Sequence, residues 1–259
     1  MYEDIRYETE DGIATVTIDR PDAYDAFTHR TIRELNAALA ESEADDGVDA
    51  LILTGAGDGF CAGADVTEMP DWGDMGRDEY ARFLRDVQSV VRQLRTNAVP
   101  SVAAVGGPAI GAGCDFALAC DARVIAPDAF LREGFVRVGL VPGDGGAWLL
   151  PRLIGESKAK EYLLTGDDIT AEDAVDLGLA VERSATPLAA AREFAGRLLD
   201  RPRVAVRRTK ELANHDGPFD EHCELAIEHQ WACVRDPEHE EAVAAFREER
   251  DPQFDREYR

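Results

Sequence analysis

The chain has 259 residues, 45% of them hydrophobic, which is enough to bury a sizeable core in one or two domains. Its 52 acidic and 28 basic residues give a formal net charge of −24, which argues against non-specific binding to nucleic acid. No run approaches the roughly 20 apolar residues of a membrane span, and the first residues, Met-Tyr-Glu-Asp, do not resemble a signal peptide. We therefore expect a cytoplasmic protein with no membrane partner, whose five cysteines are reduced.

The acidic residues are spread along the chain rather than clustered. A binding site for a cationic partner would require a cluster of acidic residues. A salt-adapted surface instead has carboxylates throughout, because they keep the protein hydrated while salt screens their repulsion. The distribution favours an acidic surface of the halophilic type.

Hydrophobic spacing predicts strands and helices in alternation through the first half of the chain. The turn Asp11-Gly12 favours a hairpin. The polar segment 69–78, with two glycines, predicts a mobile loop. The expected elements are strands at 5–9, 13–18 and 48–54 and helices at 28–41 and 80–94.

The second half continues this alternation and then becomes entirely helical beyond residue 186. Alternating strands and helices are typical of an α/β architecture. Helices with little sheet to cover would suit an oligomerisation layer. The expected elements are strands at 100–105, 123–126 and 130–132 and helices at 110–119, 147–153, 202–213, 219–234 and 237–250.

Two turns rich in glycine and alanine, each following an apolar strand, are the most informative feature of the sequence. The first is GAGDGFCAGAD at 55–65, and the second is GGPAIGAGCD at 106–115. Small side chains leave backbone N–H groups uncovered, so a ligand can approach them closely. Two such turns could supply two converging donors for a developing oxyanion, which points to acyl chemistry on a thioester.

Phosphate binding is the other use of glycine turns after strands. The second turn places glycines at Gly107, Gly111 and Gly113, which is not the G-x-G-x-x-G spacing of dinucleotide sites. The first turn lacks the Gly-Lys-Ser/Thr of a P-loop. The nucleotide interpretation is therefore the weaker one.

The late helical stretch carries several histidines and cysteines, which are metal-ligating residue types. Their spacing matches no familiar ligand pattern. We expect no metal and no cofactor. The residues concerned are His222, Cys223, His229 and Cys233.

Longer motifs resemble the crotonase superfamily, the enoyl-CoA hydratases and isomerases, and they occur in the order of that family. The resemblance spans nearly the whole chain. The motifs are DRP at 19–21, FCAGADV at 60–66, AAVGGPAIGAGCDFALACD at 103–121, VGLVPGDGGAWLLPR at 138–152, LTGDDITAEDAVDLGL at 164–179 and FREERDPQF at 246–254.

The resemblance implies a fold, an assembly and a substrate. The fold is an α/β crotonase-like spiral of ββα units over residues 1–190, with a C-terminal helical trimerisation region over residues 191–259. The assembly is a homotrimer or a hexamer made of two trimers, and the substrate is an acyl-CoA thioester.

The resemblance also implies roles for particular residues. The backbone N–H groups of Ala64 and Ala112 would hold the thioester oxygen of an enolate. The expected substrate-binding residues are Ala23, Tyr24, Ala62, Asp65, Val66, Gly111 and Phe135.

The chain departs from the hydratase pattern of two catalytic glutamates. Asp115, shorter by a methylene, occupies the first position, and Phe135 occupies the second. Asp144 stands in the turn Pro-Gly-Asp-Gly-Gly, one residue after the place where isomerases of the family carry an aspartate. We expect Asp115 and Asp144 to be catalytic, with Glu133 as a third candidate; otherwise these acids would cap helices or form salt bridges.

The leading hypothesis is an enzyme that stabilises a thioester enolate and moves a proton with a carboxylate, in double-bond isomerisation or hydration. The alternative is a CoA-thioester binding protein that keeps the oxyanion hole but lacks the catalytic pair. A third class is RNA binding, which the net charge of −24 disfavours.

Overall fold

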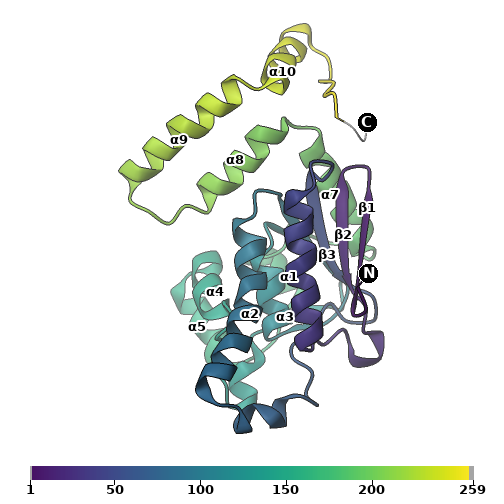
Figure 1. Ribbon diagram of the computed structural model, residues 1–259, viewed down its shortest axis with the longest axis vertical. Helices are drawn as coiled ribbons and strands as arrows, with labels where there is room; N and C mark the ends of the chain where they lie inside the picture. The colour runs from purple at the N-terminus through teal and green to yellow at the C-terminus, as the bar shows by residue number, and fades with distance from the viewer. Residues whose placement is uncertain (1, 257–259) are drawn as a thin grey trace.

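The computed structural model describes residues 2–256, apart from the side chains of Pro70 and Asp71 (Figure 1). Its main sheet has the strand order β1-β2-β3-β4-β6-β9. The first two strands are antiparallel and the remaining neighbours are parallel. The strands are β1 (Ile5–Glu10), β2 (Ile13–Ile18), β3 (Ala50–Gly55), β4 (Ser101–Val105), β6 (Ala122–Ile125) and β9 (Glu182–Arg183).

The predicted hairpin is confirmed. Asp11 and Gly12 connect β1 to β2 with φ angles of 50° and 78°. Positive φ at both positions suits a two-residue turn whose twist matches the flanking strands.

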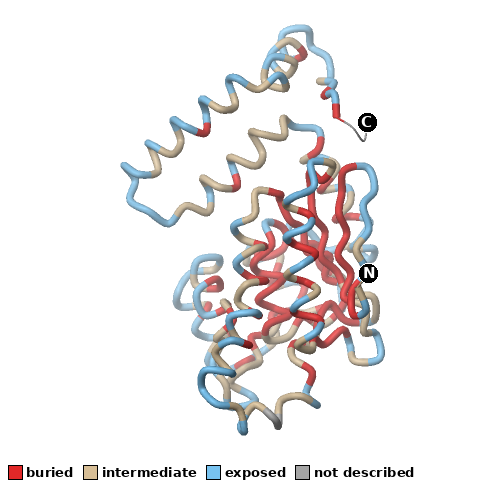
Figure 2. The backbone as a smooth tube through the Cα atoms, viewed as in Figure 1, coloured by how far each residue is buried: buried red, intermediate tan, exposed pale blue. Residues whose placement is uncertain are grey.

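Successive side chains of the central strands point to opposite faces of the sheet, and each face has its own core. In β3, Leu51 and Leu53 belong to one hydrophobic cluster, whereas Ala50 and Ile52 belong to the other. The first cluster contains apolar residues of α1 (His29–Ala44), α2 (Arg77–Thr96) and α3 (Ala112–Ala119). The second is covered by α7 (Pro187–Leu199). Figure 2 shows these buried segments at the centre of the molecule.

A second sheet, in the order β5-β7-β8, corrects one sequence expectation. The sequence predicts a helix from residue 110, but Ala109–Ile110 forms β5 beside β7 (Phe130–Arg132). Gly111 then adopts φ 57°, and α3 begins at Ala112. The third strand is β8 (Ile169–Thr170).

A 3-10 helix, η2 (Met69–Asp74), lies within the segment expected to be a loop. The other predicted strands and helices are found within a few residues of their expected ends. The remaining short elements are η1 (Pro21–Ala23), η3 (Gly134–Val138), α4 (Gly146–Ile154), α5 (Glu156–Thr165) and α6 (Ala171–Asp176).

The last helices, α8 (Arg203–Ala213), α9 (Phe219–Val234) and α10 (Pro237–Glu248), extend away from the sheet as an arm (Figure 1). Lys210 fastens α8 to the core, because its buried ammonium donates to the carbonyls of Leu94 (2.8 Å) and Val99 (3.0 Å) and pairs with Asp121 (2.8 Å). Helix α8 therefore connects the arm to the core. A boundary at residue 190 lies inside α7, which packs on the sheet.

No helix within residues 2–256 is both long enough and apolar enough to cross a bilayer.

Candidate active site

The two glycine turns lie directly against each other. Phe60 N–H donates to Pro108 O (3.0 Å), and Ile110 N–H donates to Cys61 O (2.9 Å). A Cβ on Gly113 would come within 2.1 Å of Cys61 O, so only glycine permits this approach. The expected convergence of the turns is thus observed.

Two backbone N–H groups beside the cavity, those of Ala64 and Ala112, donate to no backbone carbonyl of the described residues. Phe27 bonds to the residues on either side of Ala64, through Phe27 N–H to Gly63 O (2.8 Å) and Asp65 N–H to Phe27 O (2.9 Å). Phe27 and Ala64 therefore form a parallel bridge, in which the N–H of Ala64 points away from Phe27. Ala112 is the first residue of α3, where N–H groups have no partner within the helix. Ala64 and Ala112 thus provide donors of the kind an oxyanion hole requires.

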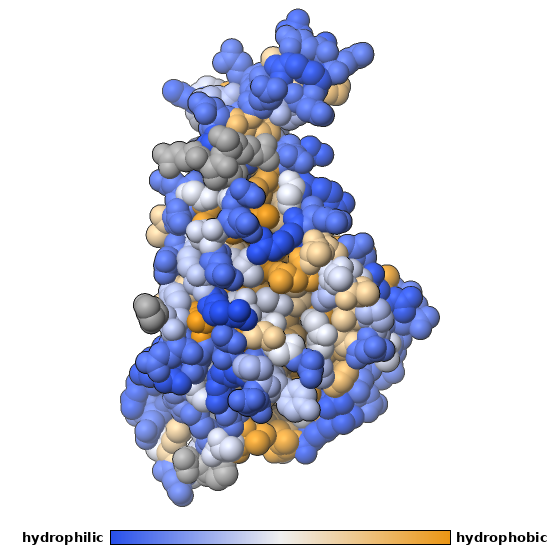
Figure 3. Space-filling model, turned by 90° about the vertical axis from the view of Figure 1, so that its right-hand side faces the viewer, coloured by the Kyte–Doolittle hydropathy of each residue, from blue (hydrophilic) through white to orange (hydrophobic). Residues whose placement is uncertain are grey.

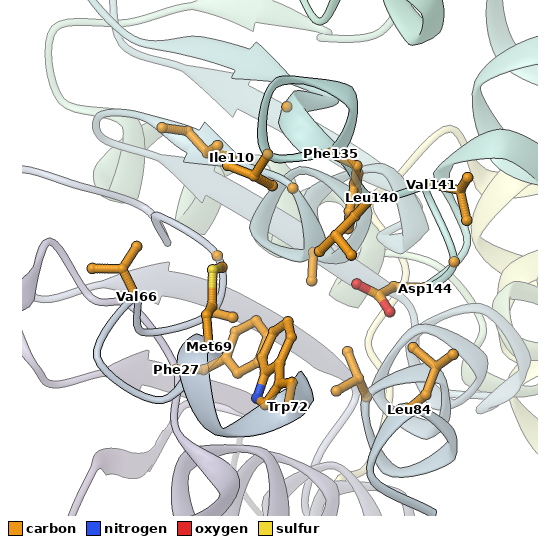
Figure 4. Close-up of a pocket in the computed structure, with 18 of the residues that line it drawn as sticks. Phe27, Val66, Met69, Trp72, Leu84, Ile110, Phe135, Leu140, Val141 and Asp144 are labelled. Atoms are coloured by element: carbon orange, nitrogen blue, oxygen red, sulfur yellow. The ribbon is translucent and has the colours of Figure 1, made fainter. Parts of the chain in front are cut away.

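Both alanines line a cavity of about 300 Å³ whose walls are almost entirely apolar. Figure 4 shows Phe27, Met69 and Trp72 on one side and Phe135, Leu140 and Val141 on the other. Helix α2 contributes further lining residues through Tyr80, Phe83, Leu84 and Val87. The remaining lining residues are Ala62, Gly63, Val66, Ile110, Gly111, Gly134, Val138, Gly143 and Asp144.

Asp144 is the one carboxylic acid among the described lining residues, and its carboxyl group points into the cavity (Figure 4). Burial raises the pKa of this group to about 6. The turn that carries it is anchored from α2, since Gln88 Nε2 donates to Gly143 O (2.8 Å). A carboxyl group with this pKa is suited to accept and return a proton near neutral pH.

Asp115 and Glu133 lie behind the cavity wall, and both are fully buried. A Cβ on Gly146 would lie 2.3 Å from Asp115 Oδ1 and 2.2 Å from Glu133 Oε1, so the two carboxyl groups meet at this glycine. Burial, followed by the neighbouring charge of Glu133, raises the pKa of Asp115 well above its usual range. Burial also raises the pKa of Glu133 to about 7.

The remaining expected binding residues divide into two groups. Ala62, Val66, Gly111 and Phe135 line the cavity. Ala23 and Tyr24 lie at η1, outside the lining of the cavity. Asp65 also lies outside the lining and pairs with Arg20 (2.9 Å). Bonds from Thr67 and Arg20 lower the pKa of Asp65 to about 2, so it is an ionised structural anchor of the first turn.

Glu133 is only a third candidate on the sequence, and the aromatic wall of the cavity is not predicted there. The wall is built by Trp72, Tyr80 and Phe83, with ring centroids 5.4 to 6.5 Å apart. Tyr80 and Phe83 belong to the amphipathic pattern of α2, which does not distinguish core from cavity, and Trp72 lies in η2, within the segment expected to be a loop. Among the described residues, no group of three or more His, Cys, Asp or Glu side chains has the geometry of a metal site.

Comparison with known proteins relates this chain to a family. A family profile described as Enoyl-CoA hydratase/isomerase matches residues 8–257. The chain belongs to that family. It is 36% identical to the crotonyl-CoA hydratase of Syntrophomonas wolfei, with 98% of each chain covered. It is 33% identical to the 1,2-epoxyphenylacetyl-CoA isomerase of Escherichia coli, covering 98% of this chain and 99% of that one.

A solved enoyl-CoA hydratase from Polaromonas sp. superposes with a TM-score of 0.92 at 29% identity, covering 97% of this chain and 99% of that one. The expected α/β crotonase fold and superfamily membership are therefore confirmed. The relatives have names of two kinds, hydratase and isomerase, so the family alone does not decide between the reactions.

Proposed function

We propose that this protein is an acyl-CoA-processing enzyme that stabilises a thioester enolate and moves a proton with a carboxylate. Double-bond isomerisation is the favoured reaction. The observation that carries this choice is the position of Asp144, whose carboxyl group shares the cavity with the two backbone donors at Ala64 and Ala112.

The oxygen of the thioester would accept from the N–H groups of Ala64 and Ala112. These donors are worth most when negative charge develops on that oxygen, because the cavity is apolar and holds them in place. The N-terminus of α3 adds its partial positive charge at the same point.

Asp144 would then carry one proton between two carbons. As a carboxylate it removes a proton from C2 of a 3-enoyl-CoA, which leaves a dienolate held at its oxygen. It returns the same proton to C4, and the double bond moves to C2–C3. One proton carrier suffices for this step, whereas hydration also needs a group that positions water.

An absorbance assay tests the proposal. A 3-enoyl-CoA should give the conjugated 2-enoyl thioester, and crotonyl-CoA should lose that chromophore more slowly by hydration. Turnover of crotonyl-CoA alone would favour a hydratase. Binding of both thioesters without turnover of either would support the alternative, a CoA-thioester binding protein.

The substrate path is proposed from the resemblance and from the cavity. We propose that Ala23, Tyr24, Ala62, Asp65 and Val66 border the coenzyme part of the ligand. The acyl group would enter the apolar cavity beside Gly111 and Phe135.

An RNA partner has no support here, and a gel shift at moderate salt would reveal one.

The arm is proposed to mediate assembly into a homotrimer or a pair of trimers. Its helices expose large apolar side chains, including Phe219, Trp231 and Phe246, each more than half exposed. Such side chains are typical of surfaces that bind another protein. Sedimentation velocity should give a trimer or hexamer, and Phe246→Glu should lower the assembly state; a monomeric wild type would contradict the proposal.

A further inference from the structure

The carboxyl groups of Asp115 and Glu133 are isolated as a pair. Both side chains are fully buried, and none of their four oxygens accepts a well-formed hydrogen bond within the described part of the chain. The nearby donors are the backbone N–H of Gly146 for Asp115 and the thiol of Cys114 for Glu133. They come from different elements, α3 and the residue before η3, yet both reach Gly146. The absence of a side chain at Gly146 is what lets them approach each other.

Two ionised carboxylates in this position would be strongly unfavourable. Each would lose its hydration without gaining a cationic partner or a well-formed hydrogen bond, and the like charges would repel. One proton between the two groups removes both problems, because it halves the charge and supplies an O–H donor to the partner carboxylate. Aspartate pairs that share a proton behave in this way.

The surrounding titratable groups reinforce this state. The Cys114 thiol adjoins Glu133, and burial raises its pKa well above the usual value, so it stays neutral. The charge of Asp144 acts on both members and further disfavours their ionisation. Neither carboxyl group forms a salt bridge with a cationic side chain of the described residues.

We propose that Asp115 and Glu133 share one proton at neutral pH, and that Glu133 is a positioning residue that keeps Asp115 protonated beside the oxyanion hole. Asp115 lies in the first turn of α3, three residues after Ala112. An ionised Asp115 would oppose the enolate charge held at that helix end, whereas a neutral Asp115 does not. The catalytic consequence rests on the proposed function, but the shared proton does not.

The shared proton can be observed in the wild-type protein without substrate. Infrared spectroscopy with ¹³C-labelled aspartate carboxyl groups would follow the C=O band of protonated aspartate from neutral to alkaline pH. We expect a band at pH 7 that Asp115→Asn removes. Glu133→Gln removes the neighbouring charge. The pH at which half of this band is lost, its titration midpoint, should therefore fall by at least about one unit.

Kinetics then test the consequence for catalysis. Glu133→Gln should move the alkaline limb of the kcat profile to lower pH while KM changes little. Glu172→Gln, which removes an exposed acid on α6, is the matched control and should change neither readout.

Two results would overturn the shared proton: no Asp115-dependent band in the wild type at pH 7, or a titration midpoint that Glu133→Gln leaves unchanged. Because the band is measured without substrate, it decides the question even if the protein turns over no acyl-CoA. With turnover intact, an alkaline limb insensitive to Glu133→Gln would overturn the positioning role.

Discussion

At the scale of single residues, the buried environment of Asp144 determines both its proposed role as a base and its effect on the stability of the fold. Burial raises the pKa of Asp144 to about 6. A base must be ionised to act, so kcat/KM should rise as the pH passes about 6 and stay high until the alkaline pH at which Asp115 ionises. Asp144→Asn should lower kcat on a 3-enoyl-CoA by roughly 10²- to 10⁴-fold and abolish this limb.

The measurement is a pH–rate profile of both proteins on the same thioester, with the unfolding midpoint checked at each pH. Asp168→Asn removes an acid that lies outside the cavity and should leave the profile unchanged. Full turnover by Asp144→Asn would show that another group moves the proton.

The same burial should make Asp144 costly for stability. Its pKa rises from 3.8 in a model peptide to about 6 in the folded protein, so the folded state binds this proton more tightly. The contribution of Asp144 to stability is therefore greatest below about pH 4 and is lost as the pH rises to about 6. A shift of about 2 units corresponds to roughly 3 kcal/mol, an upper limit.

Asp144→Asn should consequently raise the free energy of unfolding at pH 8, by on the order of 1–3 kcal/mol. Urea unfolding at pH 4 and pH 8 measures this, and the gain should be absent at pH 4. A variant less stable than the wild type at pH 8 would mean that the carboxylate is stabilised by contacts that asparagine cannot replace.

The sequence predicts which groups lie close together where they are only a few residues apart in one helix. Ala112 and Asp115 lie in one turn of helix, so their proximity follows from the sequence. The meeting of Asp115 with Glu133 does not, because it depends on β5 pairing with β7 and on the bare Cα of Gly146. Only the tertiary structure reveals that pair.

At the scale of elements, the start of α3 is the feature on which the proposed chemistry most depends. Ala112 is its first helical residue, a position where proline fits because the helix uses no N–H there. Ala112→Pro should therefore remove one oxyanion donor while retaining the helix. We expect kcat to fall about 10²- to 10³-fold.

Ala112→Ser, which keeps the N–H group, is the control for added volume and should retain most of the activity. Circular dichroism and thermal unfolding would verify that both variants fold. If Ala112→Pro kept wild-type turnover, the thioester oxygen would have to bind elsewhere.

Elements themselves were predictable in proportion to their length and periodicity. The hairpin and the long helices α1, α2 and α9 follow from hydrophobic spacing and turn residues. The two-residue strand β5 does not, because Ala109 and Ile110 carry no period of their own and are extended only by pairing with β7. The helix η2 is also not predicted, because its polar residues and glycine are typical of a loop.

At the scale of the whole molecule, the net charge of −24 is the dominant property. Hydrophilic residues cover most of the face shown in Figure 3, interrupted by smaller apolar areas. At low ionic strength, repulsion among the acids acts over long distances, about 30 Å at 0.01 M salt, and opposes the compact state. At about 1 M salt the screening length is about 3 Å, and only close pairs interact.

The protein should therefore gain stability with salt. Raising KCl from about 0.01 M to about 1 M should increase the unfolding temperature on the order of 5 °C, about 2 kcal/mol for a chain of this size. Scanning calorimetry measures the shift, with sucrose at matched osmolality as the uncharged control. An equal gain in sucrose would assign the effect to solvent exclusion. An unfolding temperature independent of KCl would show that the acidic surface is not salt-adapted, because its repulsion would then cost the folded state nothing.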